Sequence, residues 1–208
     1  MLVKICGITD EKTALEAAHA GADFIGFVFA PSSRRIAPVH AEAIVKRLPE
    51  HVKKVGVFVD ESVENMHFIA ELVGLDYVQL HGNEPTHVAK QLRYPVIKAF
   101  TLAETDEKTV TTYPCDYLLI DSPGKKYRGG SGETFDWRLF EQFSIDQNKL
   151  ILAGGLSMHN VQEAINTVRP AAVDVSSGVE TDGKKDIEKI KTFIKRAKRA
   201  YSTQHHVI

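Results

Sequence analysis

Short runs of β-branched and aromatic residues alternate with amphipathic stretches along the whole chain. This alternation is typical of repeated β-α units whose strands form a parallel sheet. We expect eight strands, at Leu2–Cys6, Phe24–Phe29, Lys54–Val59, Tyr77–His81, Val96–Phe100, Tyr117–Asp121, Leu150–Ala153 and Ala172–Val175. The helical pattern between them is clearest at Thr13–Ala20, Ala41–Leu48, Val63–Val73, Thr86–Leu92 and Ile187–Ala200.

The number of units predicts the fold class. Eight units favour an α/β fold with a single-domain (β/α)8 TIM barrel, because open sheets of this size usually have about five or six strands. An open flavodoxin-like or Rossmann sheet is the alternative. Against it, the turn Gly7-Ile8-Thr9-Asp10 after the first strand lacks the Gly-x-Gly-x-x-Gly fingerprint of dinucleotide sites. We expect residues 1–200 to form the barrel and residues 201–208 to form a flexible C-terminal tail.

Composition limits the classes of partner. The chain has 26 basic and 27 acidic residues and a formal net charge of -1, so no global field would hold nucleic acid or an anionic membrane. The two cysteines, Cys6 and Cys115, form no Cys-x-x-Cys pair. No signal-peptide pattern opens the chain, and no apolar run approaches the ~20 residues of a membrane helix. We expect a cytoplasmic protein that binds neither nucleic acid nor membrane.

Polar side chains gather at the carboxyl ends of several predicted strands. Side chains alternate across a strand, and the purely apolar faces of the first, fourth and sixth strands suit the helix layer. The opposite faces would then point into the barrel with Lys4 and Cys6, Gln79 and His81, and Asp121. Lys98 shares a face with Val96, and Asp174 falls opposite Val173 and Val175. Because polar groups are costly in a core, we expect them at the barrel mouth, where active sites of this fold lie.

Cys6 and Asp121 are the candidate catalytic pair. An isolated cysteine is usually a small buried hydrophobe, and an aspartate at a strand end often caps a turn. Lys4, two residues before Cys6 on the same face, would favour a thiolate and bring the pKa of Cys6 closer to neutrality. Asp121 would face Cys6 across the mouth. We therefore expect a base and an acid here, and we interpret Cys115 as structural.

Two neighbouring strands end in turns suited to an anion. Gly154 and Gly155 follow the seventh strand, and Ser176, Ser177 and Gly178 follow the eighth. Glycine lets the backbone approach a ligand closely, and the loops after these two strands commonly bind phosphate in such barrels.

Two further loops belong to the predicted mouth. Arg34 and Arg35 follow the second strand, and arginine is well shaped to hold a carboxylate, although adjacent arginines on a loop are often only solvated. The loop Ser122–Thr134, which contains Gly130, is either a lid or a plain surface loop.

An ordered set of motifs from the first residues to about Asp186 resembles one family. The motifs are Lys4-Ile5-Cys6-Gly7-Ile8-Thr9, Gly26-Phe27-Val28-Phe29, Gly56-Val57-Phe58-Val59, Gln79-Leu80-His81-Gly82, Gly129-Gly130-Ser131-Gly132 with Phe135-Asp136-Trp137, Gly154-Gly155-Leu156 and Asp174-Val175-Ser176-Ser177-Gly178-Val179-Glu180. Together they are similar to phosphoribosylanthranilate isomerase of tryptophan biosynthesis.

The resemblance implies a barrel of the ribulose-phosphate-binding type that carries out an Amadori rearrangement without a cofactor or metal. It implies that Cys6 is the general base, that Asp121 is the general acid and that Arg35 lies near the anthranilate carboxylate. We expect the substrate-binding residues to be Lys4, Arg35, Gln79, His81, Gly130, Gly154, Gly155, Asp174, Ser176, Ser177 and Gly178. The expected partner is a small phosphoribosylated molecule, and the chain would act as a monomer or homodimer.

Three alternatives stay open beside this interpretation. The analogous histidine-pathway isomerase carries aspartates at the ends of the first and fifth strands, where this chain has Cys6 and Phe100. A metal-dependent sugar-phosphate epimerase needs inward ligands on several strands, and only His81 is obviously placed. A phosphate-binding module without turnover would not need both Cys6 and Asp121.

Overall fold

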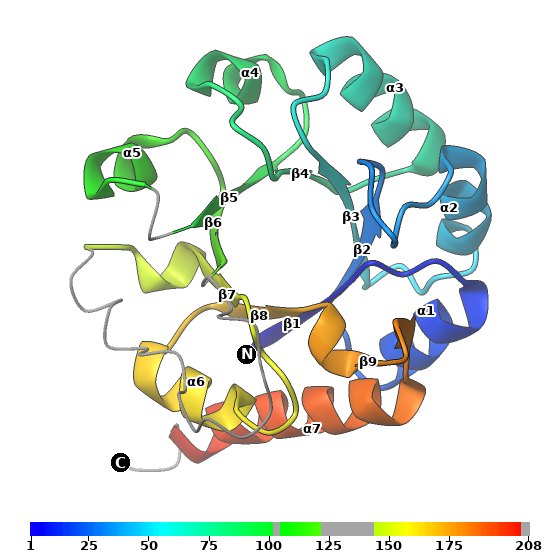
Figure 1. Cartoon of the computed structure of the whole chain (residues 1–208), viewed down its shortest axis with the longest axis vertical. Coiled ribbons are helices and arrows are strands. Elements are labelled where there is room, and N and C mark those ends of the chain that lie inside the picture. The colour runs from blue at the N-terminus through cyan, green and yellow to red at the C-terminus, as the bar shows by residue number, and fades with distance from the viewer. Residues whose placement is uncertain (102–104, 122–143, 205–208) are drawn as a thin grey trace.

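A computed structural model describes residues 1–101, 105–121 and 144–204, with side chains described to residue 200. Eight parallel strands close into a barrel in the order in which they occur in the chain, and the helices lie around the outside of the ring (Figure 1). The strands are β1 (Leu2–Cys6), β2 (Phe24–Val28), β3 (Lys53–Phe58), β4 (Tyr77–Leu80), β5 (Val96–Thr101), β6 (Tyr117–Asp121), β7 (Leu150–Ala153) and β8 (Ala172–Val175). The predicted (β/α)8 fold class is confirmed, and the strand bounds differ from prediction by at most one residue at either end.

The described helices between and after the strands are α1 (Glu11–His19), α2 (Pro38–Val45), α3 (Val63–Val73), α4 (Thr86–Gln91), α5 (Glu107–Thr112), α6 (Val161–Val168) and α7 (Ile187–Gln204). Helices α1, α3 and α5 each follow a residue whose side chain accepts a hydrogen bond from the first turn. In α3, the Ser62 side chain accepts a hydrogen bond from the Asn65 amide, and Gly74 ends the helix with φ 76°. These are the polar N-cap and left-handed glycine C-cap that satisfy the free backbone groups of helix ends.

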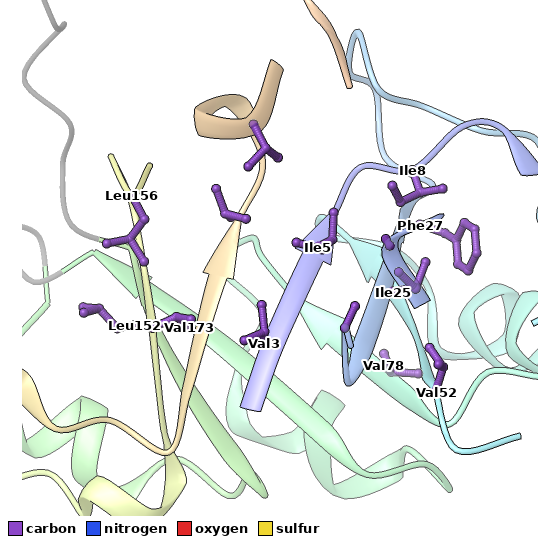
Figure 2. Close-up of a cluster of buried hydrophobic side chains, with 14 of the residues drawn as sticks. Val3, Ile5, Ile8, Ile25, Phe27, Val52, Val78, Leu152, Leu156 and Val173 are labelled. Carbon is purple, nitrogen blue, oxygen red and sulfur yellow. The ribbon is translucent and has the colours of Figure 1, made fainter. Parts of the chain in front are cut away.

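The hydrophobic residues form two layers. Outward-facing side chains of the strands, among them Val3, Ile5, Ile25 and Val173 in Figure 2, form one large cluster with buried side chains of the helices. A second, inner cluster fills the barrel, with Phe24, Val55, Ile97, Ala99, Leu119, Ile151, Ala153 and Ala172. The interior is therefore a packed core, and polar groups can be accommodated only toward its ends.

Aromatic rings fill the amino-terminal end of the barrel. The ring of Phe24 lies 5.7 Å from that of Tyr77 and 6.3 Å from that of Tyr117, in edge-to-face contacts. Edge-to-face packing is a favoured geometry for aromatic pairs. Among the described residues, these rings occupy the end of the barrel opposite the carboxyl ends of the strands.

Short elements complete the fold. The 3-10 turns η2 (Gln147–Lys149) and η3 (Ser177–Val179) flank β7 and β8, and the strands β9 (Glu180–Thr181) and β10 (Lys184–Lys185) form an antiparallel hairpin after η3. Helix α7 includes Tyr201 to Gln204, whereas the sequence predicts a flexible tail from residue 201. Within the described residues, no helix is long and apolar enough to span a membrane.

Candidate active site

The deepest part of the mouth holds a buried ion pair. Lys4 on β1 and Asp174 on β8 are partners in the parallel register, and Lys4 Nζ lies 3.0 Å from Asp174 Oδ1. The Lys4 side chain is fully buried. Burial by itself would lower the pKa of Lys4, but Asp174 and Cys6 outweigh that effect and raise it. A buried charge persists only with such compensation, so the pair forms a fixed polar floor.

Cys6 lies next to this pair, and the shift in the pKa of its thiol differs from the shift expected from the sequence. The residue is 8% exposed. Burial raises the pKa of the thiol above its ordinary value, and Asp174 adds to the rise, whereas Lys4 opposes it through charge and a hydrogen bond. Lys4 therefore lowers this pKa as expected, but the expected net shift toward neutrality is wrong, because desolvation of the thiolate is the larger effect.

A glycine on β2 makes room for the thiol. Gly26 pairs with Cys6, and a Cβ atom there would lie 2.9 Å from Cys6 Sγ and 3.2 Å from Lys4 Nζ. A glycine inside a strand often marks such a close approach of side chains from a neighbouring strand.

Asp121 ends β6 beside His81, which follows β4. Asp121 Oδ2 lies 3.8 Å from His81 Nε2, and the two side chains are 41% and 38% exposed. Although the Asp121 side chain is partly exposed, the surrounding protein desolvates the carboxylate and, with a further contribution from Asp174, raises the pKa of Asp121 to about 6. Burial and Lys4 lower the pKa of His81. The carboxyl group can therefore hold a proton near neutral pH while the imidazole beside it is neutral.

Gln79 connects this pair to the barrel interior. Its Nε2 lies 2.9 Å from His81 Nδ1, and the residue is 1% exposed. Among the described residues, Gln79 Oε1 has no hydrogen-bond partner. A buried acceptor without a partner is rare, so a ligand hydroxyl or a water would satisfy it.

The glycine and serine turns after β7 and β8 pack against each other. Gly154 and Gly155 have φ values of 79° and 61°, which favour glycine. A Cβ atom at Gly178 would collide with the carbonyl oxygen of Leu156. Ser176 donates a hydrogen bond to the Cys6 carbonyl oxygen at 3.2 Å, so the β8 turn also contacts the end of β1. The structure thus brings together Cys6, the Lys4 pair and both predicted anion turns, with Ser177 exposed at the surface.

The two adjacent arginines have different environments. Arg34 donates two hydrogen bonds to Glu180, at 2.7 and 2.8 Å, and is therefore occupied. Arg35 is exposed, and no ion pair joins it to another described residue. Arg35 is thus the arginine available to a ligand. Gly130 and the candidate lid Ser122–Thr134 lie outside the described residues.

A pocket of about 690 Å³ opens beside His81 and Asp121. Its other walls come from the loops after β3 and β4, from the end of β5 and from α5, and they include Asp60, Asn83, Glu84, Lys98, Phe100, Thr101, Thr105, Asp106, Thr109 and Tyr113. Lys98 belongs to the helix-facing side of β5, where its Nζ lies 2.8 Å from Glu84 Oε2 in a buried pair. Its position on the Val96 face therefore directs it away from the barrel interior.

The fold and site define the class of protein: a (β/α)8 barrel with a thiol, carboxyl groups and an imidazole at its mouth and glycine-containing turns after β7 and β8. The family described as PRAI, N-(5'phosphoribosyl)anthranilate (PRA) isomerase, matches residues 3–196. The chain therefore belongs to this family, and the resemblance noted in the sequence is confirmed.

Known relatives agree with this assignment over nearly the whole chain. N-(5'-phosphoribosyl)anthranilate isomerase of Bacillus mycoides is 55% identical over 200 residues, which cover 95% of this chain and 98% of the relative. The crystal structure of phosphoribosyl anthranilate isomerase from Thermotoga maritima is 46% identical, has a TM-score of 0.85, and covers 96% of this chain and 100% of its own. The Thermus thermophilus structure is 40% identical, with a TM-score of 0.84 and coverage of 96% and 99%.

Proposed function

We propose that this isomerase of tryptophan biosynthesis uses Cys6 as general base and Asp121 as general acid. Family membership supplies the reaction, which converts N-(5'-phosphoribosyl)anthranilate to 1-(2-carboxyphenylamino)-1-deoxyribulose 5-phosphate. A phosphoribosylanthranilate isomerase structure in complex with the reduced form of that product is 42% identical to this chain, with a TM-score of 0.80. The observation that carries the residue roles is the raised pKa of Asp121, about 6, in a mouth that it shares with a buried thiol.

The reaction needs one proton donor and one proton acceptor. Asp121 would protonate the furanose ring oxygen while the anilino nitrogen forms a double bond to C1, and the ring opens to a protonated Schiff base. The Cys6 thiolate would then remove the C2 proton, giving an enolamine that takes up a proton at C1 and releases the proton of its C2 hydroxyl to become the C2 ketone. Oxidation at C2 is balanced by reduction at C1 within the same molecule. Proton transfer alone therefore accounts for the conversion.

The two pKa shifts determine which protonation state reacts. Between the pKa of Asp121, about 6, and the raised pKa of Cys6, most molecules hold a thiol and a carboxylate. The reactive form, with a thiolate and a carboxylic acid, has the same number of protons, so its small fraction is constant over this interval. We expect kcat/KM to reach a plateau there, to fall below about pH 6, and to fall again above the pKa of Cys6.

The remaining residues would hold the substrate at both ends. The turns with Gly154, Gly155, Ser176, Ser177 and Gly178 support a phosphate site, because glycine backbone there can approach an anion closely. Arg35 would bind the anthranilate carboxylate. Gln79, His81 and Asp174 would contact the substrate between these ends, and Lys4, which is fully buried, would act on the substrate through Cys6.

Two variants test the assignment of acid and base. Cys6→Ser and Asp121→Asn should each lower kcat by roughly a hundredfold or more and change KM much less, as expected for general acid-base groups. The assay follows the fluorescence change as freshly generated phosphoribosylanthranilate is consumed, with and without a chelator. Turnover near the wild-type rate in either variant would refute that residue's role.

The location and assembly of the protein are also part of the proposal. We infer a cytoplasmic enzyme that acts as a monomer or a homodimer. A solved Thermotoga maritima relative, 43% identical with a TM-score of 0.79, is described as mutually generated monomers of a dimeric phosphoribosylanthranilate isomerase. Its description names both a dimer and monomers.

A further inference from the structure

A buried lysine outside the acid-base pair is connected to Cys6 by hydrogen bonds. Lys185, on β10 of the hairpin that follows β8, has a side chain that is only 5% exposed. Its ammonium donates to the Ser176 carbonyl oxygen at 2.9 Å, to Ser176 Oγ at 3.1 Å and to Glu180 Oε1 at 2.6 Å. An ammonium has three protons, so all of them are used within the protein.

Ser176 in turn connects Lys185 to the end of β1 through a second hydrogen bond. Ser176 Oγ accepts from Lys185 and donates to the Cys6 carbonyl oxygen at 3.2 Å. A hydroxyl can fill both roles at once, so the orientation of Ser176 is fixed from both sides. The lysine thus holds the β8 turn against the residue that carries the thiol.

The hairpin of β9 and β10 also contacts the loop after β2, which carries Arg34 and Arg35. Glu180 on β9 accepts from Lys185 and from Arg34, and its side chain is 8% exposed. Paired, well-packed charges of this kind hold their geometry more firmly than exposed ones. Through Glu180, the hairpin links the β8 turn to the loop that carries Arg35.

We propose that Lys185 is a positioning residue for the isomerisation, which fixes the Ser176 turn against Cys6 and supplies positive charge that favours the Cys6 thiolate. This inference rests on the proposed role of Cys6 as the base. Lys185 itself would not touch the substrate, because its three donors are occupied.

The charged groups around Cys6 determine how the removal of Lys185 should change the pKa of the thiol. Five charged groups either act on the thiol or are paired with a group that acts on it. They are Lys4 on β1, Arg34 on the loop after β2, Asp174 on β8, and Glu180 and Lys185 on the hairpin. The cations exceed the carboxylates by one. Removing Lys185 would therefore leave the surroundings neutral overall and raise the pKa of Cys6 further, since Lys185 is one of the groups that lower it.

Lys185→Met tests the inference, with Lys184→Met as its matched control. Lys184 is the exposed neighbour on the same strand. For each unit by which the pKa of Cys6 rises, the plateau of kcat/KM should fall about tenfold, and the alkaline fall should move to higher pH by about one unit. We expect both changes in Lys185→Met and neither in Lys184→Met, and Lys185→Arg should restore the position of the alkaline fall. Superimposable profiles for the two methionine variants would overturn the inference.

A second variant should shift the alkaline fall of kcat/KM in the opposite direction. Glu180→Gln removes a carboxylate beside Lys185 and should move the alkaline fall to lower pH. If both variants fold, opposite shifts distinguish a charge effect from damage to the fold. If Lys185→Met does not fold, the shift of Glu180→Gln to lower pH tests the charge effect by itself. An unchanged or upward shift in Glu180→Gln would count against the proposal.

Cys6→Ser, measured in parallel, separates the two proposals. An active Cys6→Ser variant would remove the base assignment itself, whatever Lys185 does. An inactive Cys6→Ser variant, together with a wild-type alkaline fall in Lys185→Met, would leave the assignment of Cys6 standing and reject only the role of Lys185.

Discussion

Lys98→Met should destabilise the protein strongly because it breaks a buried ion pair. The side chains of Lys98 and Glu84 are 3% and 2% exposed, and Lys98 Nζ lies 2.8 Å from Glu84 Oε2. Removing one partner of a buried pair costs about 3–5 kcal/mol. Glu84 keeps hydrogen bonds from the Asp60 and Gly82 amides, at 3.0 to 3.1 Å, so we expect a loss near the lower end, about 3 kcal/mol.

A neutral double variant separates lost charge from lost packing. In Lys98→Met with Glu84→Gln, no carboxylate is left unpaired, and the glutamine oxygen can still accept from the Asp60 or Gly82 amide. We expect the double variant to recover more than half of the stability that the single variant loses. Urea unfolding followed by circular dichroism measures both differences. A loss below about 1 kcal/mol in Lys98→Met, or no recovery in the double variant, would refute the reasoning.

The stability lost in Lys98→Met should depend on pH in a definite direction. Burial alone would raise the pKa of Glu84, but Lys98 and the backbone amides outweigh it and lower the pKa. The stability that Glu84 contributes is therefore present above its unfolded pKa, about 4.3, and is lost as the pH falls through the lower folded value. Without Lys98, protonation relieves a buried charge instead. The stability gap between wild type and Lys98→Met should narrow as the pH is lowered from 7 toward 4.

Two further predictions concern substrate binding. Arg35→Ala should raise KM about tenfold or more with little change in kcat, because a charge-assisted hydrogen bond to a carboxylate is worth about 1.5–3 kcal/mol; a wild-type KM would remove Arg35 from the carboxylate site. Gly178→Ala should raise KM for the phosphorylated substrate and lower Tm, because its Cβ would push the β8 turn away from the Leu156 carbonyl. Unchanged steady-state kinetics in Gly178→Ala would show that these turns do not set the phosphate site.

The sequence predicted the barrel closely because each strand is a short, distinct hydrophobic run. Side-chain alternation also places Cys6, Gln79 and Asp121 on the barrel-facing side of their strands, since the opposite faces of those strands are purely apolar. On β5 the same argument had no clear answer, because both faces are mostly apolar. Lys98 could be assigned only from its partner Glu84, which lies on a different loop.

Other features of the site depend on contacts between distant segments. Arg34 and Arg35 are equivalent in the local sequence, and the pairing of Arg34 with Glu180, 146 positions away, distinguishes them. The pKa of Cys6 depends on the balance between burial and the charge of Lys4, and spacing alone does not give the degree of burial. The Lys185 contacts to Ser176 depend on the turn geometry of a hairpin whose strands have two residues each.

The most direct test of the account is the kinetic isotope effect on kcat/KM for substrate deuterated at C2 of the ribose. If Cys6 removes the C2 proton and Asp121 opens the ring, Cys6→Ser makes the C2 step limiting and should show an effect well above unity. Asp121→Asn makes ring opening limiting and should show an effect near unity. Equal effects in the two variants, or the reverse order, would contradict the division of roles between the thiol and the carboxyl group.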